Sequence, residues 1–97
     1  MARITFISRM TCKPEKRTEF VAICEQLTAY VKANEPDTLM FEFFKLREPD
    51  RYVVLESFRD EAAEHLHMHS KMLADVGPKI SACLDGTWVR EYFDPLA

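Results

Sequence analysis

The chain has 97 residues, of which 47% are hydrophobic and 30% are charged, and its formal net charge is −3. A chain of this length supports one hydrophobic core, so we expect a single domain over residues 1–97. The mildly acidic balance argues against a nucleic-acid partner or an anionic membrane surface. No apolar run reaches the roughly 18 residues of a membrane-spanning helix, so we expect no membrane partner.

The three cysteines, Cys12, Cys24 and Cys83, are odd in number and share no CxxC spacing. This usage indicates free thiols in a reducing compartment, and we therefore expect a cytoplasmic protein without a disulfide framework. Only two glycines occur, Gly77 and Gly86. A glycine-rich loop that cradles phosphate is therefore excluded, and nucleotide chemistry is not expected.

The first half of the chain predicts a strand, a helix and a β-hairpin. Alternating apolar side chains predict a strand over residues 3–10. Pro14 suits the first turn of a helix, and the apolar repeat that follows predicts an amphipathic helix ending near residue 34. Two runs of strand-forming residues, Thr38–Lys45 and Arg51–Phe58, are joined by a short loop typical of a hairpin.

The second half predicts a helix and a last strand. The helix is expected to begin at residues 59–61 and to stop near Gly77-Pro78, with a short helical segment continuing through Leu84. A strand is expected over residues 87–93. The resulting order βαββαβ predicts a ferredoxin-like α+β fold, in which two helices cover one face of a four-stranded antiparallel sheet.

Both faces of the predicted sheet are apolar. In the second strand Phe41 and Phe43 point to one side, while Met40 and Phe44 point to the other. One face can pack on the helices, but the other then needs a different cover. A second copy of the chain, packed sheet against sheet, is the simplest cover, so we predict a homodimer.

The best candidate for a chemical site lies in the segment from Glu56 to Ser70. This segment combines a strand carboxylate, the aromatic Phe58 and a helix that carries His67 and Ser70. Histidine titrates near neutral pH and can act as a general acid or base, and i, i+3 spacing brings Ser70 within reach of His67. Alternatively, His67 is a structural histidine on the flank of the helix, and periodicity does not distinguish it from His69.

A third interpretation of the same helix treats Glu61, His65 and His69 as a metal-binding face. These residues are spaced four apart, which places them on one side of a helix. The sequence identifies no converging ligand elsewhere, so we expect no metal.

Glu56 lies among apolar strand residues, where an ionised carboxylate is costly unless it is paired. Arg9 or Arg90 could pair with it across the sheet. Trp88, Arg90 and Tyr92 share one face of the last strand, and aromatic walls with one cation suit an aromatic or enolic ligand, a core, or a dimer interface. The candidate substrate contacts are Phe41, Glu56, Phe58, Trp88 and Arg90.

Four short motifs occur in a fixed order, and they are Lys13-Pro14, Glu35-Pro36, Glu56-x-Phe58 and His67-x-x-Ser70. With the order of elements, this pattern resembles the antibiotic biosynthesis monooxygenase (ABM) domains over nearly the whole chain. The resemblance implies a dimeric α+β barrel with a pocket between sheet and helices, and it places His67 at the histidine position of the family. Family activities include cofactor-free oxygenation of polyphenols or quinols, haem degradation and processing of the autoinducer-2 signal. Residues 51–79 are similar to the last of these branches.

The chain also departs from the family pattern. Phe58 stands where many members have Trp or Tyr, Asp37 replaces a glycine, and Lys71-Met72 replaces a Pro-His pair. Haem-degrading members need an Asn in the first strand and a Trp in the third. Here the only Asn is Asn34 and the only Trp is Trp88, so we set haem degradation aside.

We therefore predict a cofactor-independent monooxygenase that acts on a small phenol, quinol or enolisable carbonyl compound, with O2 as co-substrate. In this hypothesis His67 takes or relays a proton, Ser70 orients His67, and Arg90 stabilises the developing oxyanion. One alternative is an isomerase that processes a signal resembling autoinducer-2, which needs proton transfer but no O2. The other is a non-catalytic, dimeric module that binds a small ligand.

Overall fold

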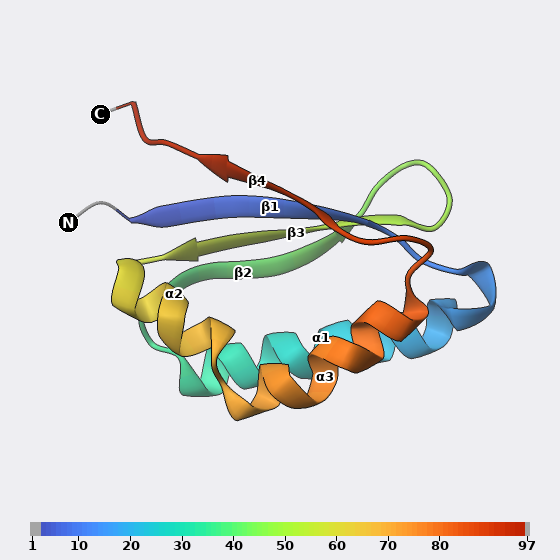
Figure 1. Cartoon of the computed structure of the whole chain (residues 1–97), viewed down its shortest axis with the longest axis horizontal. Helices are drawn as coiled ribbons and strands as arrows, with labels where there is room; N and C mark the ends of the chain where they lie inside the picture. The colour runs from blue at the N-terminus through green and yellow to red at the C-terminus, as the bar shows by residue number, and fades with distance from the viewer. Residues whose placement is uncertain (1–2, 97) are drawn as a thin grey trace.

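A four-stranded antiparallel sheet with helices on one side makes up the computed structural model, which describes residues 3–96 (Figure 1). The strands are β1 (Ile4–Thr11), β2 (Thr38–Lys45), β3 (Arg51–Phe58) and β4 (Val89–Phe93), in the spatial order β2-β3-β1-β4. The helical elements are η1 (Pro14–Lys16), α1 (Arg17–Asn34), α2 (Glu61–Met68) and α3 (Lys71–Cys83). This architecture confirms the predicted ferredoxin-like α+β fold. Within residues 3–96, no helix is both long enough and apolar enough to cross a bilayer.

The first helix follows the expected pattern with one difference at its start. Pro14 opens the 3-10 turn η1, and the α-helix itself begins three residues later at Arg17. The buried positions of α1 recur at helical spacing and face the sheet; they are Phe20, Ile23, Cys24, Leu27 and Val31. α3 lies beside α1 under the same face of the sheet, and together they enclose the main core.

The second helix breaks at Ser70 and not at Gly77-Pro78, so this part of the prediction was wrong. α2 ends at Met68, and the Ser70 hydroxyl accepts a hydrogen bond of 3.1 Å from the backbone N–H of Leu73 at the start of α3. Serine is among the preferred N-cap residues, which explains a new helix at this point. α3 then continues through Pro78, and the preceding Gly77 has no Cβ to add to the crowding around the proline ring.

The early break changes which side chains of α2 are buried. In a single straight helix, Leu66 would share the buried side with Ala63 and Ser70, three and four residues away, but Leu66 is 58% exposed. In α2, which has only eight residues, Ala63 and His67 are the buried pair, and they are separated by one i, i+4 step. His67 therefore lies at the centre of the buried face and not on its flank.

The opposite face of the sheet is not covered by helices in residues 3–96 (Figure 1). β4 is shorter than predicted and lies at one edge, with all five side chains exposed. Apolar side chains that point to the open face are Ile7, Met40, Phe44, Val53, Leu55, Val89 and Phe93, as the strand register shows. The expectation of two apolar faces is thus confirmed.

The N-cap of α3 can be tested with Ser70→Ala. Alanine removes the acceptor for the Leu73 N–H, so we expect the free energy of unfolding to fall by about 1 kcal/mol, measured by urea denaturation. Ser81→Ala, an exposed position within α3, is the matched control and should change stability by less than about 0.5 kcal/mol. An equal effect of the two substitutions would contradict the capping role.

Candidate functional site

A largely apolar cavity of about 320 Å³ lies between the sheet and the helices. All four strands and the three α-helices contribute to its walls. The apolar lining includes Leu27, Phe41, Phe43, Leu73 and Trp88. The polar side chains that line it are Ser8, Glu56, His67, Ser81 and Arg90. A small organic molecule with an apolar body and a few polar groups matches this composition.

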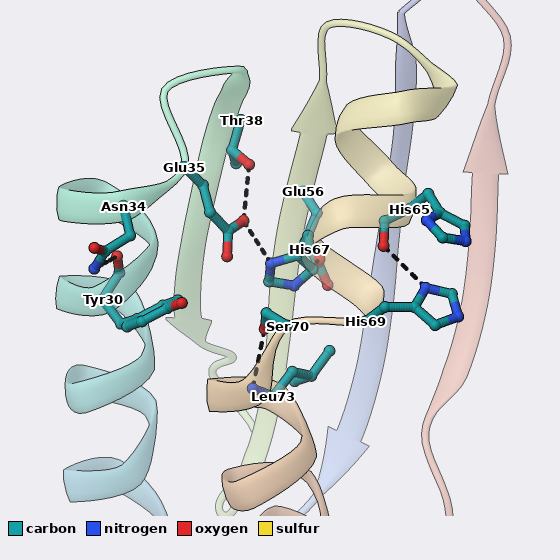
Figure 2. Close-up of polar contacts among 10 residues, drawn as sticks. All are labelled: Tyr30, Asn34, Glu35, Thr38, Glu56, His65, His67, His69, Ser70 and Leu73. Atoms are coloured by element: carbon teal, nitrogen blue, oxygen red, sulfur yellow. Dashed lines mark hydrogen bonds and ion pairs between the residues drawn. The ribbon is translucent and has the colours of Figure 1, made fainter.

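His67 lies in the wall of the cavity between two carboxylates (Figure 2). Its Nδ1 is 2.8 Å from Oε1 of Glu35, and its Nε2 is 3.4 Å from Oε1 of Glu56. The imidazole is only 2% exposed and packs against the rings of Phe41 and Phe58, with centroid distances of 5.2 and 5.3 Å. The ring therefore lies between two carboxylates and packs against two aromatic rings.

Three separate elements bring these groups together. Glu35 is the C-cap residue of α1, where its backbone N–H donates to the carbonyl of Val31. Glu56 lies on β3 opposite Phe41 of β2, on the face of the sheet that the helices cover. His67 is in the last turn of α2, a helix whose first turn is fixed by the cap of Asp60 on the N–H of Ala63, at 2.9 Å. The site thus depends on the packing of distant segments of the chain.

The electrostatics of the site favour a charged imidazole. Burial alone would lower the pKa of His67, but the Glu56 and Glu35 carboxylates beside it raise its pKa by more, so the net pKa lies above the ordinary value. The Thr38 hydroxyl also donates a hydrogen bond of 3.1 Å to Oε1 of Glu35. Buried charges of opposite sign that contact each other in this way offset part of their desolvation cost.

Arg90 lies at another part of the cavity wall and does not pair with Glu56. Its Nε–H donates to the Ser8 hydroxyl at 3.4 Å, and its guanidinium lies 4.2 Å from the centre of the Phe6 ring. Arg9 points to the other face of the sheet, where it pairs with Glu91 at 2.7 Å. The expectation that an arginine pairs with Glu56 was therefore wrong, because the partner of Glu56 is His67.

Only some of the remaining candidate residues line the cavity. Phe41 and Trp88 line the cavity, whereas Phe58 is fully buried behind His67. Ser70 contacts His67 through the backbone, since its N–H donates to the His67 carbonyl at 3.2 Å while its hydroxyl caps α3. Tyr92, from the same strand face as Arg90, donates its hydroxyl proton to Glu64 at 3.0 Å.

The two histidines of the proposed metal-binding face contact each other. His65 and His69 point away from His67 (Figure 2), and their rings stack on each other with a centroid distance of 4.0 Å. Nδ1 of His69 contacts the carbonyl of His65 at 2.9 Å. Among residues 3–96, no group of three or more His, Cys, Asp or Glu side chains is arranged to hold a metal ion.

The cysteines lie outside this site. All three are buried and free, and burial raises the pKa of Cys24 to about 12. Burial is also the main cause of the raised pKa of the Cys12 and Cys83 thiols. Such thiols carry little thiolate at neutral pH and are poor nucleophiles.

Glu35 was not among the site residues predicted from the sequence. Its position before Pro36 indicated only the end of a helix and a family motif. It is 5% exposed, which is unusual for a glutamate next to a helix end. A glutamate at the junction between a helix and an apolar strand was the available signal, but nothing in the sequence links it to His67, which lies 32 residues further along the chain.

Comparison with known proteins identifies the family. The antibiotic biosynthesis monooxygenase family matches residues 3–76, and the chain therefore belongs to this family. A Bacillus subtilis protein named "Putative monooxygenase YcnE" is 38% identical over 55 residues, which cover 57% of this chain and 58% of that relative. The match thus spans little more than half of that curated relative.

Solved structures of similar proteins share the fold over nearly the full chain. One from Caulobacter crescentus, described as a putative antibiotic biosynthesis monooxygenase, has a TM-score of 0.92 at 27% identity, covering 98% of this chain and 91% of that one. A conserved protein from Methanosarcina mazei has a TM-score of 0.87 at 26% identity, covering 96% and 92%. The resemblance to the ABM family stated from the sequence is therefore confirmed.

The raised pKa of His67 predicts a pH-dependent contribution to stability. Since the folded state raises this pKa above the ordinary value of 6.5, the contribution is fully present below about pH 6.5 and is lost as pH rises through the folded-state pKa. We therefore expect the stability difference between wild type and His67→Asn to shrink with rising pH, by about 1.4 kcal/mol for each unit of pKa elevation.

Urea denaturation at a series of pH values measures this difference. His65→Asn removes an exposed histidine from the same helix and serves as the matched control, which should follow the wild type at each pH. A stability difference between wild type and His67→Asn that stays constant across the series would contradict the charged contact.

Proposed function

We propose that the protein is a cofactor-independent monooxygenase of the ABM type that oxidises a small phenol or quinol. The main support is the position of His67 in the wall of an otherwise apolar cavity, with one carboxylate on each ring nitrogen. A buried acid–base pair beside a space of about 320 Å³ suits proton transfer with a small, poorly solvated substrate.

The first step in this proposal is removal of the phenol proton. Glu56 and His67 both line the cavity, and Nε2 of His67 faces Oε1 of Glu56. The proton passes from the phenol to this pair, which acts as the general base. Ser70 contributes indirectly, because it ends α2 and holds the His67 backbone in place.

The developing phenolate is stabilised by Arg90. Its Nε–H is tied to Ser8 and its guanidinium plane lies over Phe6, so the other guanidinium nitrogens remain available to an anion in the cavity. A cation fixed before the reaction stabilises negative charge without further reorganisation. Phe41 and Trp88 supply aromatic walls on which the ring of the substrate can pack.

The phenolate then reacts with O2, which it reduces by one electron, and the two radicals combine to form a C–O bond at the ring carbon. The Glu56–His67 pair protonates the peroxide and then accepts the proton from the C–H bond of that carbon. The O–O bond breaks, one oxygen stays as a carbonyl, and the other leaves as hydroxide. Hydroxide takes from the Glu56–His67 pair the proton that left the ring carbon and becomes water, so phenol and O2 give quinone and water. All electrons for the reduction of O2 come from the substrate.

We further propose that the protein is a homodimer in which the open faces of two sheets pack together. The open face carries Leu55 and Ile7 at its centre, and Phe44 and Phe93 are exposed nearer its edges. An apolar face of this kind is typical of an interface between subunits. In the dimer, the sheet of the partner would cover the open face of each sheet, while the helices cover the other face.

Oxygen uptake tests the activity. With a panel of phenols and quinols, we expect wild-type turnover to consume one O2 per quinone formed, and His67→Asn to lower kcat/KM by about 10²–10⁴-fold. His65→Asn, from the exposed side of the same helix, should keep wild-type activity. Equal rates for wild type and His67→Asn would remove His67 from the mechanism. Turnover of an enolisable carbonyl compound without O2 would instead indicate an isomerase.

The proposed dimer predicts a specific effect of Leu55→Glu. A carboxylate in the centre of the open face would be buried in the interface, so we expect this variant to be monomeric by analytical ultracentrifugation while the wild type is dimeric. Leu66→Glu, at an exposed leucine on α2, is the control and should remain dimeric. A dimeric Leu55→Glu variant would show that the subunits meet elsewhere.

A further inference from the structure

Glu35 lies on the side of His67 that faces away from the substrate cavity. It does not line the cavity, whereas His67 and Glu56 do. Its side chain is nearly fully buried, at 3% exposure, and it touches Nδ1 of His67 at 2.8 Å (Figure 2). A substrate in the cavity would therefore not contact Glu35, and any influence of Glu35 on the reaction must pass through His67.

The contact with Glu35 favours a proton on one particular nitrogen of the His67 ring. Oε1 of Glu35 accepts the hydroxyl proton of Thr38 at 3.1 Å and is also the atom that faces Nδ1. An ionised carboxylate can only accept hydrogen bonds, so an ionised Glu35 requires Nδ1 to be the donor in this contact. In a neutral imidazole the proton then lies on Nδ1, and Nε2 has the free electron pair.

Few other groups near the imidazole can affect which of its nitrogens carries the proton. In the described part of the chain, the ionisable groups that contact the ring are Glu35, from the end of α1, and Glu56, from β3. β2 and the end of β3 contribute the aromatic rings of Phe41 and Phe58. Of the two carboxylates, Glu35 makes the shorter contact and has hydrogen-bond geometry.

We infer that Glu35 is a positioning residue that keeps a proton on Nδ1 of His67, so that proton exchange with Glu56 and substrate takes place at Nε2. This inference rests on the proposed function, in which the Glu56–His67 pair takes the proton of the substrate. A carboxylate that fixes the tautomer of a catalytic histidine has the same effect in other enzymes, where its loss leaves the geometry intact but lowers turnover strongly.

Glu35→Gln is the sharpest substitution for a test. Glutamine has nearly the same shape but can present its NH2 group to Nδ1, which would favour the opposite tautomer. We expect kcat to fall by about 100-fold with little change in KM, because Glu35 does not line the cavity. Asp37→Asn, two residues away and paired with Arg59 at the surface, is the matched control and should keep wild-type kinetics.

Nuclear magnetic resonance of the His67 ring gives a readout that does not depend on turnover. In wild type, at a pH where the ring is neutral, we expect the ring proton on Nδ1, and in Glu35→Gln we expect it to move to Nε2. A wild-type spectrum with the proton on Nε2 would overturn the inference, and this measurement needs no variant to fold. Wild-type kcat in Glu35→Gln, together with loss of activity in His67→Asn, would also overturn it while leaving the proposed function intact. If no phenol or quinol is oxidised, the proposed function fails, but the proton position on His67 is still decided by the spectra.

Discussion

The contact of His67 with two buried carboxylates is the interaction that joins the helical layer to the sheet at the candidate site. Glu35 belongs to the end of α1, Glu56 to β3, and His67 to α2. α2 buries only one other side chain, Ala63, so much of its attachment depends on the imidazole. Removing one member of such a buried group leaves an unpaired charge, which typically costs about 3–5 kcal/mol. The same contact therefore supports both the position of α2 and the acid–base chemistry proposed for the cavity.

The break at Ser70 allows the chain after β3 to serve two purposes. α2 directs His67 toward Glu35 and Glu56, while α3 runs beside α1 and provides Leu73 and Ile80 to the wall of the cavity. In one straight helix the buried residues would all lie along one side of the same axis. His67 could then not face the two carboxylates while Leu73 and Ile80 line the cavity as observed. The N-cap of Ser70 makes the change of direction favourable, because it satisfies a backbone N–H at the new helix start.

Local patterns predicted most of the fold but only part of the site. Alternation along β1 to β3 and the apolar repeat of α1 are signals within single segments, and the corresponding elements were found close to the expected bounds. Gly77-Pro78 was a misleading signal, since α3 continues through this pair to Cys83. The partners of His67 could not be predicted, because Glu35 and Glu56 come from other elements and meet it only after folding. Only the resemblance to a family favoured His67 over His69.

The register of the sheet also explains why the acidic and basic groups of the cavity do not neutralise each other. On β1, Phe6 lies opposite Glu56 of β3 and Ser8 lies opposite Arg90 of β4, so strand β1 lies between the strands that carry the carboxylate and the guanidinium. Arg90 stacks on the Phe6 ring and bonds to Ser8, and Glu56 turns to His67. An ion pair between Glu56 and Arg90 would hold both groups in one contact. Because each group has its own partner, the cavity keeps the carboxylate beside His67 at one place and the positive charge of Arg90 at another. This arrangement suits a substrate that gives up a proton and retains the negative charge.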